Sequence, residues 1–158
     1  MAIYTPTVGI ITNIDAAQRN YSIFFDLQSE DQGPVRILLP ANAYVLNLHP
    51  FQVGDRATFF YPNGAPAPLI YPPQYTAAVA AYTPHGVTAT LDVFDNNFIN
   101  NDHTLILTPS MTTPVTLPNG QSFTGDTSGN LILATYTNTT RSIPARAIPE
   151  QMVVFPTM

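Results

Sequence analysis

The chain has 158 residues, of which 45% are hydrophobic, 16 are proline and none is cysteine, and its net charge is −5. This composition permits a hydrophobic core and excludes a wholly disordered chain, disulfides and thiolate metal sites. The acidic balance and the five scattered arginines argue against nucleic-acid binding, and no apolar run approaches the roughly 18 residues of a membrane span. Residues 1–20 show no secretory signal, and nothing in the sequence indicates a compartment.

The first half of the chain predicts short antiparallel strands, because β-branched and aromatic runs alternate with polar turns that are too short for crossover helices. We expect these strands at residues 7–14, 21–27, 35–39, 56–61 and 75–82. Residues 41–48 are compatible with either a further strand or one helical turn. No stretch of the chain keeps a helical period long enough to predict an α-helix.

The second half continues the same pattern after the turn at residues 83–86. We expect strands at residues 87–94, 103–108, 131–137 and 151–155. Residues 114–123 predict a hairpin around Asn119-Gly120, a dipeptide that favours tight hairpin turns.

Two parts of the sequence resemble each other. Residues 53–82 and residues 129–155 each contain an apolar strand that ends in tyrosine (Tyr61, Tyr136), then a connection with a proline (Pro72, Pro144), and then a closing strand. The similarity predicts an internal duplication. We therefore expect an all-β fold of two tandem small barrels, OB-like in character, with the first unit at residues 1–84 and the second at residues 85–158.

The phrase that begins at Tyr136 and runs Thr-Asn-Thr-Thr-Arg-Ser-Ile-Pro-Ala-Arg146 resembles a signature of uncharacterised small β-domains from spore-forming Gram-positive bacteria. In those domains a strand with aromatic residues precedes Thr-Arg/Lys-Ser-x-Pro-x-Gln and a final strand. The turn at residues 53–55 is similar to the same domains. This chain departs from the pattern at Arg146, where glutamine is usual, and the first unit lacks Thr-Arg-Ser. The resemblance implies a bacterial origin and an association with the cell surface or spore, but no activity.

Three groups of residues have side chains of the kinds used in catalysis or metal binding. The stretch from Asp92 to His103 is rich in oxygen ligands of the kind calcium prefers, but it lacks EF-hand spacing, and such residues also cap turns. The Asp126-Thr-Ser-Gly sequence lacks the second carboxylate of an aspartic protease. His49, His85 and His103 lie far apart in the sequence, and no recognisable nucleophile accompanies them. We expect no catalytic residue, no metal and no cofactor, with a hydrolase based on Asp92–His103 as a remote third hypothesis.

Four residues are candidates for binding a ligand or partner. Tyr61, Tyr71 and Tyr75 lie in or beside the proline-rich connection at residues 62–73, which predicts either a stiff contact surface or a lid over the end of a barrel. Arg141 has a planar guanidinium suited to a carboxylate or glycan, or else it pairs with loop carbonyls and acids of its own unit.

The leading hypothesis is a non-enzymatic structural or interaction module that forms a homo-oligomer or binds a protein partner. Low charge favours self-association because little electrostatic repulsion opposes it. The alternative is an OB-like module that binds a glycan or another ligand. Nucleic acid is not an expected partner.

Overall fold

The structure, a computed structural model, describes residues 3–16, 21–65 and 69–156. Its regular elements are thirteen strands and one short 3-10 turn, so the prediction of an all-β chain is confirmed. The chain divides into two units, here called the N-terminal unit (Tyr4–His85) and the C-terminal unit (Gly86–Met158, with which Met1–Ile3 is grouped). Within the described residues, no helix has the length and apolar character needed to cross a membrane.

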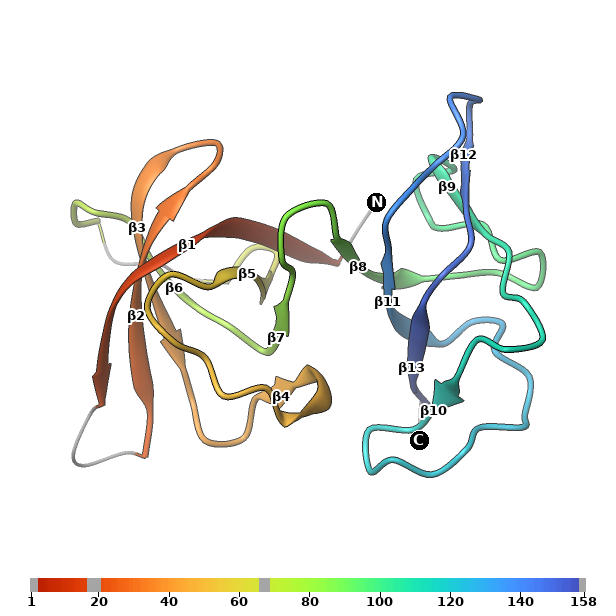
Figure 1. The fold of residues 1–158 in the computed structure, drawn as a ribbon, viewed down its shortest axis with the longest axis horizontal. Coiled ribbons are helices and arrows are strands. Elements are labelled where there is room, and N and C mark those ends of the chain that lie inside the picture. Colours follow the sequence, from red (N-terminus) through yellow and green to blue (C-terminus); the bar gives the residue numbers. More distant parts are fainter. Residues whose placement is uncertain (1–2, 17–20, 66–68, 157–158) are drawn as a thin grey trace. The chain divides into compact units, whose positions relative to one another are not determined.

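The N-terminal unit contains one seven-stranded sheet in the order β4-β7-β5-β1-β2-β3-β6 (Figure 1). Its elements are β1 (Tyr4–Ala16), β2 (Ile23–Ser29), β3 (Gly33–Leu39), β4 (Tyr44–Val45), the 3-10 turn η1 (Leu46–Leu48), β5 (Arg56–Pro62), β6 (Gln74–Thr76) and β7 (Val79–Tyr82). The two possibilities left open for residues 41–48 therefore both occur, as a short strand followed by a single turn.

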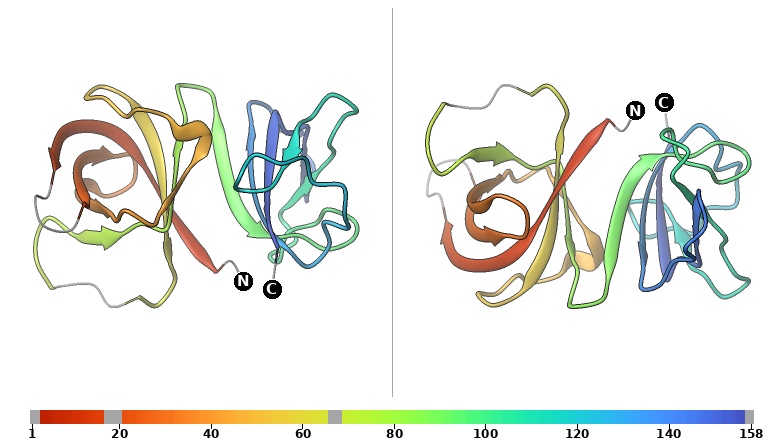
Figure 2. Two further views of the ribbon diagram at one scale, coloured as in Figure 1. Left: turned by 90° about the horizontal axis from the view of Figure 1, so that it is seen from below. Right: turned by 90° about the horizontal axis from the view of Figure 1, so that it is seen from above.

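Strand β1 is long and strongly bent, as Figure 2 shows. It pairs with β5 through its first half and with β2 through its second half, and Gly9 and Ile10 pair with both. A Cβ atom on Gly9 would lie 2.5 Å from the carbonyl oxygen of Gln28, so only glycine permits this close approach. A register shift between Ile11 and Asn13 adds a bulge, which increases local bending.

The core of this unit follows from alternation along its strands. Phe25 and Leu27 of β2 are buried, as are Val35 and Ile37 of β3, while the residues between them are more exposed. This period of two places one face of the sheet in the core and leaves the other in contact with solvent. Phe25 also packs its ring against Phe59 of β5, at 5.3 Å between centroids.

Residues 75–82, expected to form one strand, are divided between two partners. Strand β6 pairs in parallel with β3, and β7 pairs antiparallel with β5. At the junction the amide of Ala77 donates to the carbonyl of Leu38 (2.9 Å), and the amide of Ala78 donates to the carbonyl of Phe60 (2.8 Å). The segment is therefore hydrogen-bonded to both the β3 edge and the β5 side of the same unit.

The C-terminal unit has a four-stranded sheet in the order β10-β13-β11-β8 and a separate pair, β12-β9. Its strands are β8 (Thr88–Val93), β9 (Leu105–Leu107), β10 (Val115–Thr116), β11 (Leu131–Tyr136), β12 (Ala145–Ala147) and β13 (Gln151–Phe155). Its core gathers buried side chains from five segments, among them Phe94, Leu107, Ile132 and Met152. The expected hairpin at residues 114–123 is present as a turn with a single bridge, Thr116 to Ser122.

Four strand pairs of the N-terminal unit have counterparts in the described residues of the C-terminal unit, where no named strand corresponds to β2. Strand β1 pairs antiparallel with β5 as β8 does with β11, and β5 pairs antiparallel with β7 as β11 does with β13. The parallel pairs also correspond, because β3 pairs with β6 as β9 does with β12, and β4 pairs with β7 as β10 does with β13.

Backbone hydrogen bonds between matching residues also recur in the two units. The amide of Gly54 donates to the carbonyl of Ile11 (2.8 Å), and the amide of Gly129 donates to the carbonyl of Phe94 (2.9 Å). Both glycines have positive φ, +97° and +76°, and each lies two residues before its strand, β5 or β11. The two turns therefore have the same construction.

A second repeated bond fixes the register at the other end of the same strands. The amide of Ala78 donates to Phe60 at 2.8 Å, and the amide of Glu150 donates to Thr135 at 2.7 Å. Counting from these residues places Tyr61 at the position of Tyr136, as the sequence comparison expected.

None of the sheets formed by the described residues closes on itself. The two small barrels expected from the sequence are therefore not present as sheets that close through continuous hydrogen bonding. The physical reason in the N-terminal unit is that the strand expected at residues 75–82 changes partner midway, from β3 to β5, which interrupts the ladder. In the C-terminal unit β12 and β13 likewise pair with different strands, β9 and β11.

Candidate functional site

Tyr61 and Tyr75, two of the tyrosines selected from the sequence, lie together in the N-terminal unit. Their rings stack with centroids 4.2 Å apart and planes 5° apart. Tyr61 is the last residue but one of β5 and Tyr75 is the middle residue of β6, so the pair joins the two ends of the proline-rich connection. The hydroxyl of Tyr75 donates to Oε1 of Gln32 at 3.2 Å. Burial raises the pKa of Tyr61, and the neighbouring Tyr75 raises it further.

The part of the connection that lies shortly before Tyr75 is exposed. Leu69, Ile70 and Tyr71 have exposed fractions of 104%, 54% and 79%. The lid interpretation requires such side chains to be covered, so it does not apply to these three residues. Residues 66–68 of the connection lie outside the described residues.

Arg141 belongs to the C-terminal unit, in the loop between β11 and β12, and is exposed. Within the described part of the chain its guanidinium makes no ion pair with Glu150 or any other acid. Its neighbours hold the loop: Oγ1 of Thr140 and Oγ of Ser142 are 2.7 Å apart, and Ser142 donates to the carbonyl of Pro144 at 2.9 Å.

His49 forms a cluster that the sequence did not indicate. Its Nε2 lies 3.0 Å from Oδ2 of Asp55, and its ring stacks on Tyr82 with centroids 4.1 Å apart and planes 2° apart. Oδ2 of Asp55 also accepts from the amide of Gln52 at 3.0 Å. Partial burial raises the pKa of Asp55, but these two hydrogen bonds outweigh it and lower the pKa below its usual range.

Beside this cluster lies a polar cavity of about 360 Å³. Arg56 at its wall donates through Nε to Oε2 of Glu30 at 2.8 Å and through Nη1 to the carbonyl of Thr83 at 2.9 Å. The hydrogen bond and charge of Arg56 lower the pKa of Glu30. The arginine and the Glu30 carboxylate therefore largely satisfy each other.

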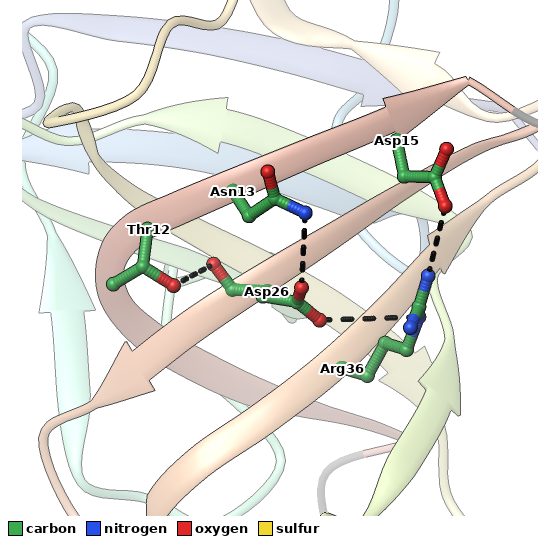
Figure 3. Close-up of polar contacts among 5 residues, drawn as sticks. All are labelled: Thr12, Asn13, Asp15, Asp26 and Arg36. Atoms are coloured by element: carbon green, nitrogen blue, oxygen red, sulfur yellow. Dashed lines mark hydrogen bonds and ion pairs between the residues drawn. The ribbon is translucent and has the colours of Figure 1, made fainter.

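The solvent-facing side of β1, β2 and β3 carries a ladder of charged residues, shown in Figure 3. Arg36 Nη2 lies 3.4 Å from Oδ2 of Asp15, and its Nε lies 3.9 Å from Oδ1 of Asp26. Asn13 donates to Oδ2 of Asp26 at 3.3 Å. The guanidinium of Arg36 also lies 4.5 Å above the ring of Phe24, a cation–π contact.

The oxygen-rich stretch from Asp92 to His103 is organised as turns. Oδ1 of Asp95 accepts from the amides of Asn97 (2.8 Å) and Ile99 (3.1 Å), as expected for a carboxylate that caps its own turn. Asp92 is buried, and burial raises its pKa. In the part of the chain that the structure describes, no three His, Asp or Glu side chains gather as a set of metal ligands.

The sequence similar to an aspartic-protease motif also forms a turn. Oδ1 of Asp126 accepts from the amide of Ser128 at 2.9 Å, and Gly129 follows with positive φ. This hydrogen bond lowers the pKa of Asp126. The carboxylate therefore closes a local turn.

Sequence reasoning also missed Arg146, which lines a cavity in the C-terminal unit that Arg141 does not line. The available signal was the departure at residue 146 from the pattern of the β-domains that the phrase at residues 136–146 resembles, in which glutamine is usual. Comparison of the chain with protein-family models, curated proteins and solved structures finds no match.

Proposed function

We propose that this chain is a non-enzymatic interaction module that self-associates through the apolar segment Leu69-Ile70-Tyr71. The observation that carries the proposal is the exposure of three consecutive large apolar side chains in one connection. Isolated exposed apolar residues are common, but grouped ones indicate a contact surface.

The composition of the connection supports binding with a small loss of conformational entropy. Prolines at 62, 66, 68, 72 and 73 restrict the backbone of the segment before any partner arrives. Tyrosine provides a large contact area with only two rotatable side-chain bonds. A second copy of this chain is the partner favoured by charge, because only 9% of residues are charged and repulsion between copies is weak.

The proposed scaffold is a tandem pair of OB-like units that arose by duplication. Matching strand pairs, the matching glycine turns and the repeated bonds at Ala78 and Glu150 support this origin. If the segment 74–82 is treated as one bent strand, the pairing order of the N-terminal unit is compatible with a partly open OB barrel. If the segment 145–155 is treated in the same way, the C-terminal unit has the same order apart from the second strand, where only isolated bridges occur. The resemblance of residues 129–155 to β-domains of spore-forming bacteria supports a place at a bacterial surface or spore.

The alternative function is ligand binding on the OB-like face of β2 and β3, a face that binds oligonucleotides or oligosaccharides in other OB folds. Phe24 on this face is aromatic, which suits a sugar ring, although the Arg36 guanidinium covers one side of its ring. Arg36 already pairs with Asp15 and Asp26, so the face lacks free positive charge for phosphates. This observation favours a glycan over nucleic acid.

The proposal is tested by replacing Leu69, Ile70 and Tyr71 together with serine and measuring sedimentation velocity over a wide range of concentrations. The triple variant should remain monomeric at concentrations at which the parent chain associates. Met111→Ser removes an apolar side chain that is 104% exposed elsewhere, and it serves as the matched control that should associate like the parent. Equal association of the parent and the triple variant would refute the proposed surface.

A further inference from the structure

The C-terminal unit holds a second cavity, of about 470 Å³, beside β12. Three segments form its wall: Thr108 after β9, residues 137–140 after β11, and residues 146–148 in and after β12. The volume lies within the range of roughly 300–1,000 Å³ that is typical of small-molecule sites.

The wall of this cavity is held by hydrogen bonds between its own segments. The amide of Arg146 donates to Oγ1 of Thr140 at 2.9 Å, and the amide of Thr140 donates to the carbonyl of Arg146 at 2.9 Å. Oγ1 of Thr108 donates to the carbonyl of Ala147 at 3.1 Å. A ligand would therefore meet a wall that is already formed, which reduces the entropy lost on binding.

The charge in this wall is available to a ligand. Arg36 and Arg56 in the N-terminal unit are paired with carboxylates. The exposed guanidinium of Arg146, by contrast, makes no hydrogen bond or ion pair with any other residue that the structure describes. A guanidinium presents parallel N–H groups that match a carboxylate, so an unpaired one at a cavity favours an organic acid.

The matching positions in the N-terminal unit carry different side chains. Counting from the repeated hydrogen bonds at Ala78 and Glu150 places Ala147 at the position of Tyr75 and Arg146 at the position of Gln74. In the N-terminal unit the Tyr75 ring stacks on Tyr61. The C-terminal unit has a methyl group in place of that ring and a cation in place of the neighbouring amide.

We propose that this cavity binds a small organic carboxylate. The Arg146 guanidinium holds the carboxylate group, while the exposed side chain of Ile148 and the threonine methyl groups contact the body of the ligand. This site uses other residues than the proposed self-association segment and, unlike that segment, it contains a charged side chain. Its ligand has no role in self-association.

The test is an NMR titration of the full isotope-labelled chain with three probes: galacturonate, galactose and butyrate. Binding of galacturonate, butyrate or both should saturably shift the amide signals of residues 137–140 and 146–148, whereas neutral galactose should not. Galacturonate alone would identify a sugar acid as the natural class, and butyrate alone would identify an aliphatic acid. Absence of saturable shifts with both acids, or equal shifts with galactose, would overturn the proposal.

Variants of the two unpaired arginines separate a specific contact from general charge. Arg146→Gln, which introduces the residue of the N-terminal unit, should weaken binding about tenfold or more, because a hydrogen bond to a charged group is lost. Arg146→Lys should restore only part of the affinity, since lysine lacks the guanidinium fork. Arg141→Gln is the matched control, because Arg141 is exposed and does not line the cavity. Equal weakening by Arg141→Gln and Arg146→Gln would overturn the assignment. Because residue 146 is exposed, each variant should keep the parent's amide spectrum outside the cavity.

Discussion

The rings of Tyr61 and Tyr75 stack 4.2 Å apart and join the two ends of the connection that presents Leu69, Ile70 and Tyr71. Strand β6, which carries Tyr75, has only three residues and pairs with β3, so its own ladder ties the end of the connection to β3 and not to β5. The stacked pair adds a contact to β5, and the exposed segment is therefore attached to the sheet on both sides.

Tyr75→Ala should destabilise the N-terminal unit by about 1–3 kcal/mol, since it removes both buried area and the stacking contact. Tyr71→Ala is the control and should change stability by less than about 0.5 kcal/mol, because its side chain is largely exposed. Urea denaturation followed by circular dichroism measures both. A similar loss of stability in the two variants would show that the stack contributes nothing specific.

Gly9→Ala should destabilise the chain more than any exposed substitution in β1. A methyl group at this position would lie 2.5 Å from the Gln28 carbonyl oxygen, a backbone atom that cannot rotate away. We expect a loss of about 2–3 kcal/mol, at the upper end of the range for overpacking. Ile10→Ala, at a side chain that is 42% exposed, should cost much less. Thermal denaturation of both variants gives the comparison, and wild-type stability of Gly9→Ala would show that β1 and β2 do not approach so closely.

Gly54→Ala and Gly129→Ala should destabilise their own units by similar amounts, about 1–2 kcal/mol each. Nothing lies within 4 Å of the added methyl group in either case, so the penalty comes only from the left-handed backbone. Hydrogen exchange assigns each loss to β5 or to β11. A large effect at one glycine and none at the other would contradict the shared construction of the two turns.

Asp55→Asn should lower stability at neutral pH by about 1–2 kcal/mol, through the hydrogen bonds to His49 and Gln52. The pKa of Asp55 is lower in the folded chain than in the unfolded chain, so its contribution is present above the unfolded pKa of about 3.9. That contribution is lost as the pH falls through the folded pKa. The difference between variant and parent should therefore persist from neutral pH to about pH 4 and shrink below it.

Denaturation curves at a series of pH values measure this difference. Asp15→Asn is the control, because its ion pair with Arg36 is exposed and should contribute less than about 1 kcal/mol. If the gap between Asp55→Asn and the parent grew as the pH fell below about 4, the lowered pKa of Asp55 in the folded chain would be contradicted.

Alternation and turn chemistry made the strands predictable. Phe25 and Leu27 point to the core because they lie two residues apart in a strand, and Gly54 and Gly129 mark turns because they accept positive φ. The break in residues 74–82 was not predictable, because the apolar run through Ala77 and Ala78 is continuous and only the facing strands determine where it changes partner.

The candidate site was harder to predict from the sequence, for a related reason. Tyr61 and Tyr75 were identified as flanking a connection, but their stacking depends on how β5 and β6 are each held by other strands. Arg141 and Arg146 are both exposed arginines five residues apart, and only the hydrogen bonds between residues 140 and 146 place one of them at a cavity. His49 and Asp55 lie on opposite sides of a turn whose geometry the sequence does not specify.

The most direct test of self-association is light scattering in line with size exclusion on the parent chain at several concentrations. The chain has a mass of 17.2 kDa. We expect a mass that rises with concentration to a whole multiple of this value. A mass of 17.2 kDa at every concentration would refute self-association, because the exposed segment Leu69-Ile70-Tyr71 would then not bring copies of the chain together.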